Sequence, residues 1–403
     1  MSTSLLYHAF GLQGYVHQRA EYVGGEVHFH AVQPAKRLRC AACRSRRVIR
    51  RGARERRFRG LPIGSRRVWI VLEVPRLECK DCGVVRQAEV SFAPGQHGYT
   101  KRFARYVLEL ARHMTMTDVA HHLGVSWNLV KALLKEDLQR RFGRPSLKGL
   151  RFLAIDEISI GHGHRYLTVV LDLESGVVVF LGEGKGAKAL DPFWRRLRRF
   201  GARIEAVAID MSQAYIHAVR LHLPRATLVF DPFHVVKLMN DKLSDLRREL
   251  QRQATSEEKA VLKGTRWLLL KDPGKLDPSR KEAEHLEAAL QLNAPLAAAY
   301  YLKEDLRQLW KQPNKASATR FLDAWIARAR TTGLRQLVRM ANTLSVHRQG
   351  LLAHYDVPIS TGPLEGINNK IKTLQRQAYG FRDKAFFRLR IYALHETRYA
   401  LIG

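Results

Sequence analysis

Two pairs of cysteines, each with two residues between its members, constrain the fold of this chain more than any other feature. The pairs are Cys40–Cys43 and Cys79–Cys82, and they hold all four cysteines of the 403-residue sequence. Two thiolates at this spacing can bind one ion, and two such pairs complete a closed tetrahedral zinc site. We therefore predict a structural Zn²⁺, with four unmetallated thiols as the alternative. A catalytic zinc is disfavoured because four thiolates leave no open position.

The segment between the cysteine pairs is strand-like and strongly basic. Residues 67–74 form an apolar, β-branched run, which favours a β-ribbon carried by two zinc knuckles. Residues 36–76 contain fifteen Lys and Arg but only two acidic residues, Glu55 and Glu73. Such a density of one charge is costly without counter-charge, so we expect the ribbon to lie along phosphates, with a solvated basic face as the alternative. The predicted DNA contacts here are Arg46, Arg47, Arg50 and Arg51.

The charge of the whole chain also indicates a polyanionic partner. Lys and Arg number 69 against 37 Asp and Glu, a formal net charge of +32, which favours a nucleic-acid partner over a ribosomal or membrane-surface role. An apolar content of 46% is enough for folded cores. The sequence has no apolar run of about 18 residues and no secretory signal, so we expect no membrane association and a cytoplasmic protein, nucleoid-associated when bound.

A helix-turn-helix is predicted after residue 100. The segment from Met116 to Lys135 has a small Ala120 where two helices cross, Gly124 at the turn and Ser126 as a cap for the second helix. An ordinary helical hairpin is the alternative, but the basic ribbon that precedes it favours DNA binding. The residues expected to face the groove are Trp127, Asn128 and Lys131.

Strands and helices alternate beyond a linker at residues 144–149. Three strands in a meander, a crossover helix beginning near Pro192, then strand, helix and strand describe an RNase H-like sheet order. The expected strands are 152–156, 166–172, 177–181, 204–210 and 227–230. Before the cysteines, Gly24 and Gly25 between two strand-like runs predict a hairpin.

Residues 235–355 are rich in Leu, Ala, Lys, Arg and Glu and are predicted to be helical, with Trp310 and Trp325 in their core or, alternatively, one of them stacking on a base. The fold class is therefore multidomain α/β: an RNase H-like core interrupted by an all-helical insertion and preceded by a β zinc ribbon and a helix-turn-helix. The expected domains are 1–98, 99–145, 146–234, 235–355 and 356–403. Basic helices near the chain's end are expected to contact DNA through Lys370, Lys372, Arg376 and Arg382.

Three carboxylates stand out as a candidate cage for divalent metal. Asp156 and Asp210 each end an apolar strand-like run, and Glu365 lies 155 positions after Asp210, beyond the helical segment. Glu157 neighbours Asp156 but points to the other face of a strand, so only one of the two can enter a site. A lone Asp at a strand end is more often a turn residue, and the joint pattern is what favours metal binding.

Several motifs together resemble one family. They are Ala-Ile-Asp156-Glu, Ile-Asp210-Met-Ser-Gln-Ala-Tyr, Asp231-Pro-Phe-His234, Gly-Pro-Leu-Glu365-Gly-Ile-Asn-Asn-Lys and Tyr-Gly-Phe-Arg382. With the cysteine pairs and the helix-turn-helix in order, nearly the whole chain resembles bacterial insertion-sequence transposases of the ISL-three group, in the DDE superfamily. The first knuckle departs from the family pattern, with Ala41 for the common Pro and Arg44 for the usual closing Gly.

This resemblance implies a DNA transposase that binds terminal inverted repeats and performs metal-dependent strand cleavage and strand transfer into target DNA. It implies Asp156, Asp210 and Glu365 as catalytic ligands of two Mg²⁺, with Mn²⁺ as a substitute and Asp156 bridging both ions. Asp231 and His234 would support the site. A homodimer or larger assembly on double-stranded DNA is expected, because two ends must be held together. The alternatives are a non-catalytic DNA-binding regulator and a structure-specific RNase H-like nuclease.

Overall fold

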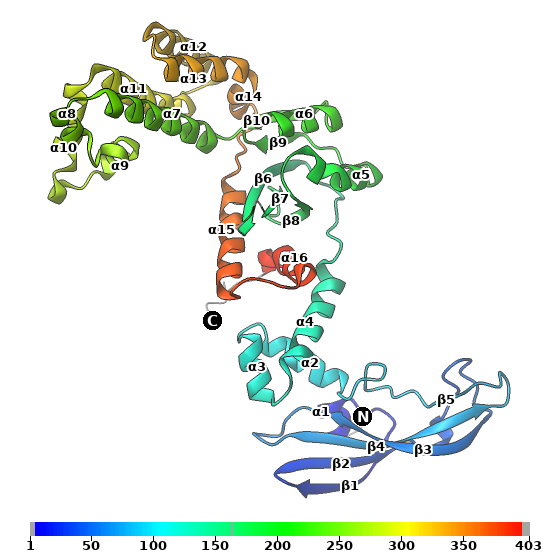
Figure 1. Ribbon diagram of the computed structural model, residues 1–403. Coiled ribbons are helices and arrows are strands. Elements are labelled where there is room, and N and C mark those ends of the chain that lie inside the picture. Colours follow the sequence, from blue (N-terminus) through cyan, green and yellow to red (C-terminus); the bar gives the residue numbers. More distant parts are fainter. Residues whose placement is uncertain (1–4, 162, 164, 397–403) are drawn as a thin grey trace. The chain divides into compact units, whose positions relative to one another are not determined.

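A computed structural model describes residues 5–161, 163 and 165–396 of the chain (Figure 1). These residues fold as two compact units that divide between Gly143 and Arg144. The first unit contains a β-sheet and a helix-turn-helix, and the second contains a mixed sheet and a long helical segment.

The first unit is built on a five-stranded sheet in the order β1-β2-β4-β3, with β5 also paired to β4. The predicted hairpin is confirmed: β1 and β2 are antiparallel, and Gly24 and Gly25 turn between them with φ of +56° and +78°. Phe58, Ile70 and Leu72 are fully buried in its core. The elements are α1 (Leu5–Phe10), β1 (Val16–Val23), β2 (Glu26–Val32), a 3-10 turn (Ala35–Arg37), β3 (Val48–Arg59), β4 (Val68–Cys79) and β5 (Val85–Gln87).

The helix-turn-helix follows as α2 (Lys101–Leu110), α3 (Met116–Leu123) and α4 (Trp127–Phe142). Gly124 adopts φ +60° at the turn, and the Ser126 hydroxyl accepts the Leu129 N–H at 3.2 Å. Both are the roles predicted from the sequence. Val130 is fully buried where the helices pack together.

Arg59 joins the sheet to the helix-turn-helix. Its side chain is only 5% exposed, and its Nη2 donates to the carbonyl of Leu123 at the end of α3 at 2.8 Å. The guanidinium also lies 5.4 Å from the Trp69 ring centroid and 5.7 Å from that of Phe103. Burial lowers the pKa of Arg59, and among the described residues its Nε and Nη1 have no hydrogen-bond partner. Sheet and helices therefore share one packed interface.

The second unit begins with a five-stranded sheet in the order β10-β9-β6-β7-β8. β6, β7 and β8 form the antiparallel meander, while β9 and β10 extend it in parallel with β6, which is the RNase H-like order predicted from the sequence. The described elements are β6 (Phe152–Gly161), β7 (Arg165–Asp172), β8 (Val178–Glu183), a 3-10 turn (Ala187–Leu190), α5 (Asp191–Phe200), β9 (Ala206–Ile209), α6 (Gln213–His222) and β10 (Thr227–Phe230).

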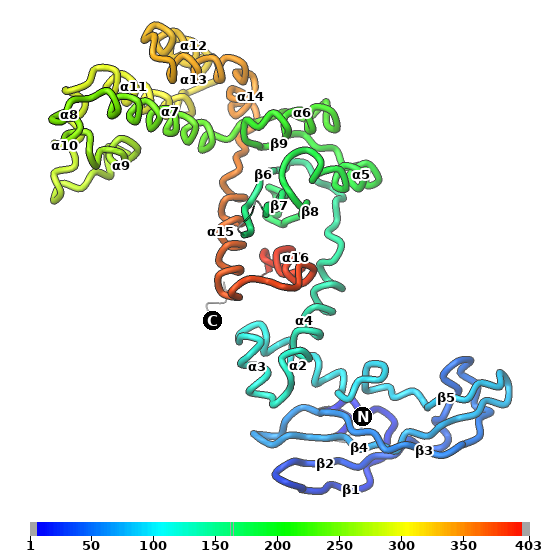
Figure 2. The backbone as a smooth tube through the Cα atoms, in the orientation of Figure 1, coloured from blue at the N-terminus to red at the C-terminus, as the bar shows by residue number. Residues whose placement is uncertain are grey.

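The helical insertion leaves the sheet after β10. Its first helix, α7 (Pro232–Gln253), begins two residues after β10 and runs unbroken into the insertion, as the backbone tube of Figure 2 shows. Trp325 is fully buried and donates its Nε1–H to the Leu302 carbonyl at 2.8 Å, which confirms its predicted place in the core. The other helices are α8 (Ser256–Leu262), α9 (Thr265–Leu270), α10 (Glu282–Leu292), α11 (Ala294–Leu306), α12 (Lys315–Thr331), α13 (Arg335–Val346) and α14 (Arg348–Leu352), with 3-10 turns at Pro273–Lys275, Pro278–Arg280, Arg307–Lys311 and Ala353–Tyr355.

Two helices then return to the sheet. α15 (Gly362–Gln377) lies alongside β6, and α16 (Lys384–Tyr392) packs on β8, where Arg388 Nη2 donates to the Leu181 carbonyl at 2.6 Å (Figure 1). A 3-10 turn (Leu394–Glu396) follows α16. Within the described residues, no helix is both long and apolar enough to cross a membrane.

Candidate active site and zinc knuckles

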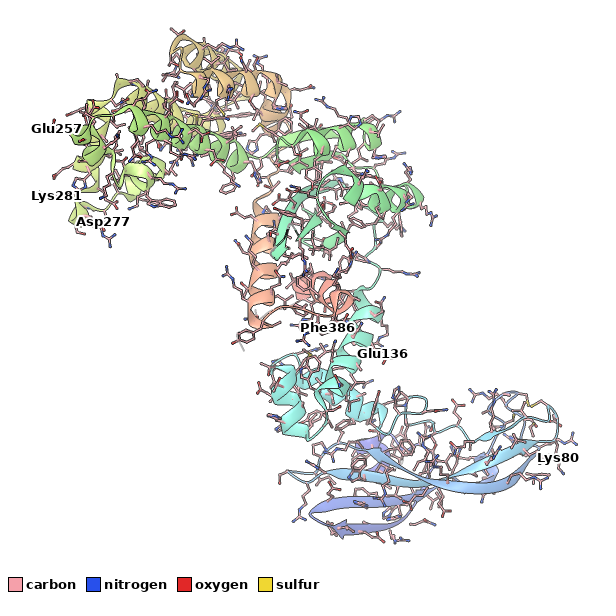
Figure 3. All side chains as sticks on the ribbon, in the orientation of Figure 1. Lys80, Glu136, Glu257, Asp277, Lys281 and Phe386 are labelled. Atoms are coloured by element: carbon pink, nitrogen blue, oxygen red, sulfur yellow. The ribbon has the colours of Figure 1, made fainter. Side chains whose placement is uncertain are left out.

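The four cysteines converge at one end of the ribbon. Their Sγ atoms all lie within 4.8 Å of one another, with Cys40 3.6 Å from Cys82 and Cys43 3.5 Å from Cys79. A tetrahedron with Zn–S bonds of about 2.3 Å has sulfur atoms about 3.8 Å apart, so the donor set fits zinc. Lys80, labelled in Figure 3, marks this end of the ribbon.

Each knuckle closes on a residue with positive φ. Gly83 has φ +70° and its N–H donates to the Cys79 carbonyl at 3.0 Å, while Arg44 has φ +63° and its N–H donates to the Cys40 carbonyl at 3.0 Å. The two knuckles are therefore alike in backbone although one lacks the glycine. Backbone N–H groups of Cys43 and Ala42 lower the pKa of Cys40 to about 6, and the backbone N–H of Cys82 lowers the pKa of Cys79, whereas the pKa values of Cys43 and Cys82 are raised with the neighbouring thiols as a cause. One cysteine of each pair is therefore the more readily deprotonated.

Three carboxylates lie near the end of the pairing between three adjacent parallel strands. Ala154 pairs with Ala208, and Asp156 of β6 and Asp210, the residue after β9, each follow that last pair by two residues. Phe230 pairs with Ile209, which sets Asp231, the residue after β10, beside Asp210. The β6–β9 ladder ends at the Ala154–Ala208 pair, and the carboxyl ends of parallel strands are where α/β sheets bind ligands.

One face of α15 borders this row of carboxylates. The Thr361 N–H, at the start of α15, donates to Asp231 Oδ1 at 3.3 Å, and Asn368 Nδ2 donates to Asp156 Oδ2 at 2.9 Å. Glu365 follows Thr361 by four residues and precedes Asn368 by three, so the three positions share one helical face. The Glu365 side chain itself is exposed.

The surroundings of Asp156 disfavour its ionised form. Burial raises the pKa of Asp156, and the charges of Asp210 and Glu157 raise it further, while the Glu157 N–H and His234 act in the opposite direction. His234, in the first turn of α7, therefore lies within electrostatic reach of Asp156. A carboxylate held in such surroundings is one that a cation would stabilise.

Asp156 and Glu157 face opposite sides of the sheet. The Glu157 carboxylate accepts from the Tyr215 hydroxyl at 3.2 Å, and that hydroxyl also lies 3.2 Å from Thr168 Oγ1. Burial raises the pKa of Tyr215 to about 12, so it remains a donor. Asp156 is the residue that faces α15.

Two buried oxygen atoms beside the carboxylates have no partner. Asp231 is 3% exposed and Asn368 7% exposed, and Asp231 Oδ2 and Asn368 Oδ1 accept no hydrogen bond from any residue that the structure describes. Unpaired buried oxygens next to carboxylates suit a hard divalent cation. The donors are not drawn tightly together, since among the described residues only the four cysteines gather three or more metal-binding side chains within 4.8 Å.

The residues expected to contact DNA are mostly exposed. In the ribbon, Arg47 pairs with Asp81 at 2.9 Å and Arg51 with Glu78 at 2.5 Å, whereas Arg46 and Arg50 are exposed and form no ion pair with the described part of the chain. On α4, Trp127 is 42% exposed and Lys131 Nζ lies 5.5 Å from its ring centroid. The other predicted contacts, also exposed, are Asn128, Lys370, Lys372, Arg376 and Arg382.

Sequence reasoning missed Asn368. Its signal was available, because Asn368 follows Glu365 by one helical turn and so faces the same way. What the sequence lacked was the partner, Asp156, which lies 212 positions away.

A zinc ribbon, a helix-turn-helix and an RNase H-like sheet with carboxylates at its carboxyl edge together define a DDE transposase. The family models agree: a transposase model matches residues 153–391, a helix-turn-helix domain of transposase family ISL3 matches 88–137, and a zinc finger of the transposases of IS204, IS1001, IS1096 and IS1165 matches 36–82. The chain belongs to the ISL3 family of transposases.

Two curated relatives extend the comparison. The transposase of insertion sequence element IS1001 from Bordetella parapertussis is 34% identical over 95% of this chain and 96% of its own. That of IS1557 from Mycobacterium tuberculosis is 31% identical over 86% and 83%. Among solved structures, the Drosophila P element transposase strand transfer complex has a TM-score of 0.39 and 11% identity, covering 74% of this chain and 92% of that one.

Proposed function

We propose that this transposase cleaves and joins DNA at the terminal inverted repeats of a bacterial insertion sequence, with Asp156, Asp210 and Glu365 as its catalytic carboxylates. The proposal is supported by the strand register, in which Asp156 and Asp210 each follow the Ala154–Ala208 pair by two residues, and by the contact of Asp156 with Asn368 on α15, the helix that bears Glu365. Bound divalent cations, Mg²⁺ with Mn²⁺ as a substitute, would activate the attacking oxygen and stabilise the leaving oxygen.

The chain's own residues prepare this site. Asn368 donates from its amide to Oδ2 of Asp156 and so orients that carboxylate. Asp231 accepts the Thr361 N–H at the start of α15 and would thereby fix the position of Glu365, one helical turn later, relative to the sheet. His234 counters the charge of Asp156.

The remaining modules would deliver DNA to the site. We propose zinc bound by all four cysteines, and a division into domains 1–98, 99–145, 146–234, 235–355 and 356–403. The exposed basic side chains of the ribbon, of α4 and of α15 would contact phosphates, and a dimer or larger assembly would hold two ends. Support comes from the family membership and from the net charge of +32.

Cleavage of a labelled duplex that carries one end of the element tests the proposal. Asp156→Asn, Asp210→Asn and Glu365→Gln are each expected to abolish Mg²⁺-dependent cleavage while duplex binding stays within about twofold. Glu157→Gln is the matched control, because Glu157 faces Tyr215, and it should retain cleavage. Cleavage at wild-type rate by any of the first three variants would remove that residue from the site.

The same assay separates the rival functions. Binding of the element's end with no metal-dependent cleavage by the wild-type chain would favour a DNA-binding regulator. Cutting of branched DNA without any need for terminal repeats would favour a structure-specific nuclease. A synaptic complex with a single chain would contradict the proposed assembly.

A further inference from the structure

A basic hollow lies between α7 and α13 in the helical insertion. Its volume is about 440 Å³. Its cationic lining consists of Lys242, Arg248 and Arg252 from α7 and Arg335 and Arg339 from α13. No DNA contact was predicted for α7 or α13 from the sequence.

Most of this positive charge is uncompensated. Arg248 pairs with Asp245 at 2.5 Å and Arg335 with Glu249 at 3.4 Å. For the other three cations no carboxylate lies within ion-pair distance among the described residues; they are Lys242, Arg252 and Arg339. Three unpaired cations around one hollow repel one another unless an anion is bound.

The hollow is preformed by the packing beneath it. Leu246 of α7 and Leu337 of α13, each next in sequence to a residue that lines the hollow, are buried, with 3% and 1% of their surface exposed. Gln336 is 7% exposed and its Nε2 donates to Glu249 Oε2 at 2.5 Å, which links the two helices at the hollow. The cations therefore project from a fixed frame, which lowers the ordering cost of binding.

α7 sets the distance between the hollow and the candidate active site. Lys242 follows His234 by eight residues and Arg252 follows it by eighteen, within one unbroken helix. At 1.5 Å per residue these positions lie about 12 and 27 Å along the helix from His234. A duplex lying along α7 rises about 3.4 Å per base pair and would cover this span in about four to eight base pairs.

We propose that the basic hollow binds the phosphodiester backbone of duplex DNA about four to eight base pairs from the phosphate that is cleaved. The inference rests on the proposed function, because the distance is counted from the candidate active site. The helical insertion thereby becomes a DNA-binding element in addition to the ribbon and the helix-turn-helix.

The test compares two full-length triple variants that remove the same charge. The test variant carries Lys242→Gln, Arg252→Gln and Arg339→Gln, and the control carries Lys259→Gln, Lys263→Gln and Lys275→Gln, at exposed positions elsewhere in the insertion. Fluorescence anisotropy measures Kd from 50 to 300 mM salt for duplexes of the element's end. These duplexes extend either 3 or 12 base pairs beyond the cleavage point, on one side or the other.

On the duplex that reaches the hollow, we expect the test variant to bind at least tenfold more weakly than wild type. The slope of log Kd against log salt should fall by about 2 to 3, at about 0.9 per lost phosphate contact. On duplexes shortened to 3 base pairs on the side that reaches the hollow, the Kd values of the test variant and of wild type should agree within about twofold. Arg339→Gln alone, at an exposed position with no ion pair to residues 5–161, 163 or 165–396, should lower the slope by about 1.

Three outcomes would overturn the inference: equal affinity and slope on every duplex, an equal loss in the control variant, or a loss that persists on the shortened duplexes. Displacement of the long duplex by a nucleoside triphosphate, without any dependence on duplex length, would also overturn it. Cleavage of the long duplex by the wild type is scored separately. Its absence would refute the proposed function and leave the affinity comparison standing.

Discussion

Replacing Asp156 by Asn should stabilise the protein when no Mg²⁺ is added. Asp156 and Asp210 belong to neighbouring strands, whose backbones lie about 4.8 Å apart, and we use about 5 Å as an order-of-magnitude separation of their charges. At an effective dielectric constant of about 20, two unit charges at that separation repel by about 3 kcal/mol. Both side chains are partly exposed, and water and salt reduce the gain from neutralisation to about 1–2 kcal/mol. The new amide oxygen can still accept from Asn368.

The stabilising effect of Asp156→Asn should depend on pH. Because burial raises the pKa of Asp156 in the folded chain, its ionisation destabilises the fold at pH values above that raised pKa. The penalty disappears as pH falls below the ordinary carboxyl range. The stabilisation by Asp156→Asn should therefore be full at pH 7.5 and vanish near pH 4.

Scanning calorimetry of the full-length protein measures the effect. A gain of about 1–2 kcal/mol corresponds to about 2–8 °C in Tm for a unit of this size. Buffers are freed of divalent metal by a resin and contain no chelator, so that zinc stays in the ribbon. Mg²⁺ at a hundred times its Kd should stabilise wild type by about 2.7 kcal/mol and the variant much less.

The control is Glu257→Gln, at an exposed position on α8 that Figure 3 labels. Its loss makes the net charge of +32 more positive and relieves no local repulsion, so Tm should stay level or fall. An unchanged or lower Tm for Asp156→Asn at pH 7.5, or a difference that persists at pH 4, would refute the reasoning.

Three further outcomes are expected. Asn368→Leu removes the amide that donates to Asp156. Because a hydrogen bond to a charged group contributes about 1.5–3 kcal/mol, the variant should cleave at least tenfold more slowly with DNA affinity unchanged. An unaltered cleavage rate would show that Asn368 does not position Asp156. Cys79→Ser should lower bound zinc from about one equivalent to near zero by mass spectrometry and weaken DNA binding, and full zinc content would exclude Cys79 as a ligand. Gly350→Ala places a Cβ 2.4 Å from the Phe230 ring, so overpacking should cost about 1–3 kcal/mol by thermal denaturation, and a wild-type Tm would show that the ring can move.

Local structure was readable from the sequence because short-range chemistry determines it. The strand at Thr227–Phe230 was predicted with the bounds observed, and the turn at Gly124 and the cap at Ser126 follow from backbone geometry and one hydrogen bond. The four cysteines were paired by spacing alone, and their convergence needed only that the two knuckles share a ribbon.

The arrangement of the candidate site was not readable in this way. The register between β6 and β9 depends on pairing between segments about 50 residues apart in the sequence. The residues around Asp231 likewise do not show that it lies beside Asp210. The contact of Asn368 with Asp156 likewise depends on how α15 lies along β6. The choice between Asp156 and Glu157 was left to strand alternation, and their different partners distinguish the two.

Arg59 has a consequence for how relatives of this protein can diversify. Its guanidinium is buried in the sheet and caps the end of α3, so the recognition helices and the ribbon are stabilised by one shared side chain. Because the acceptor is a main-chain carbonyl, an exchange of the helix-turn-helix alone between two family members keeps this hydrogen bond only if α3 ends at the same place against the sheet; a shift would leave a buried cation without a partner, which is strongly destabilising. Exchange of the two together keeps that contact intact. New DNA specificities should therefore be inherited as a joint ribbon-and-helix cassette.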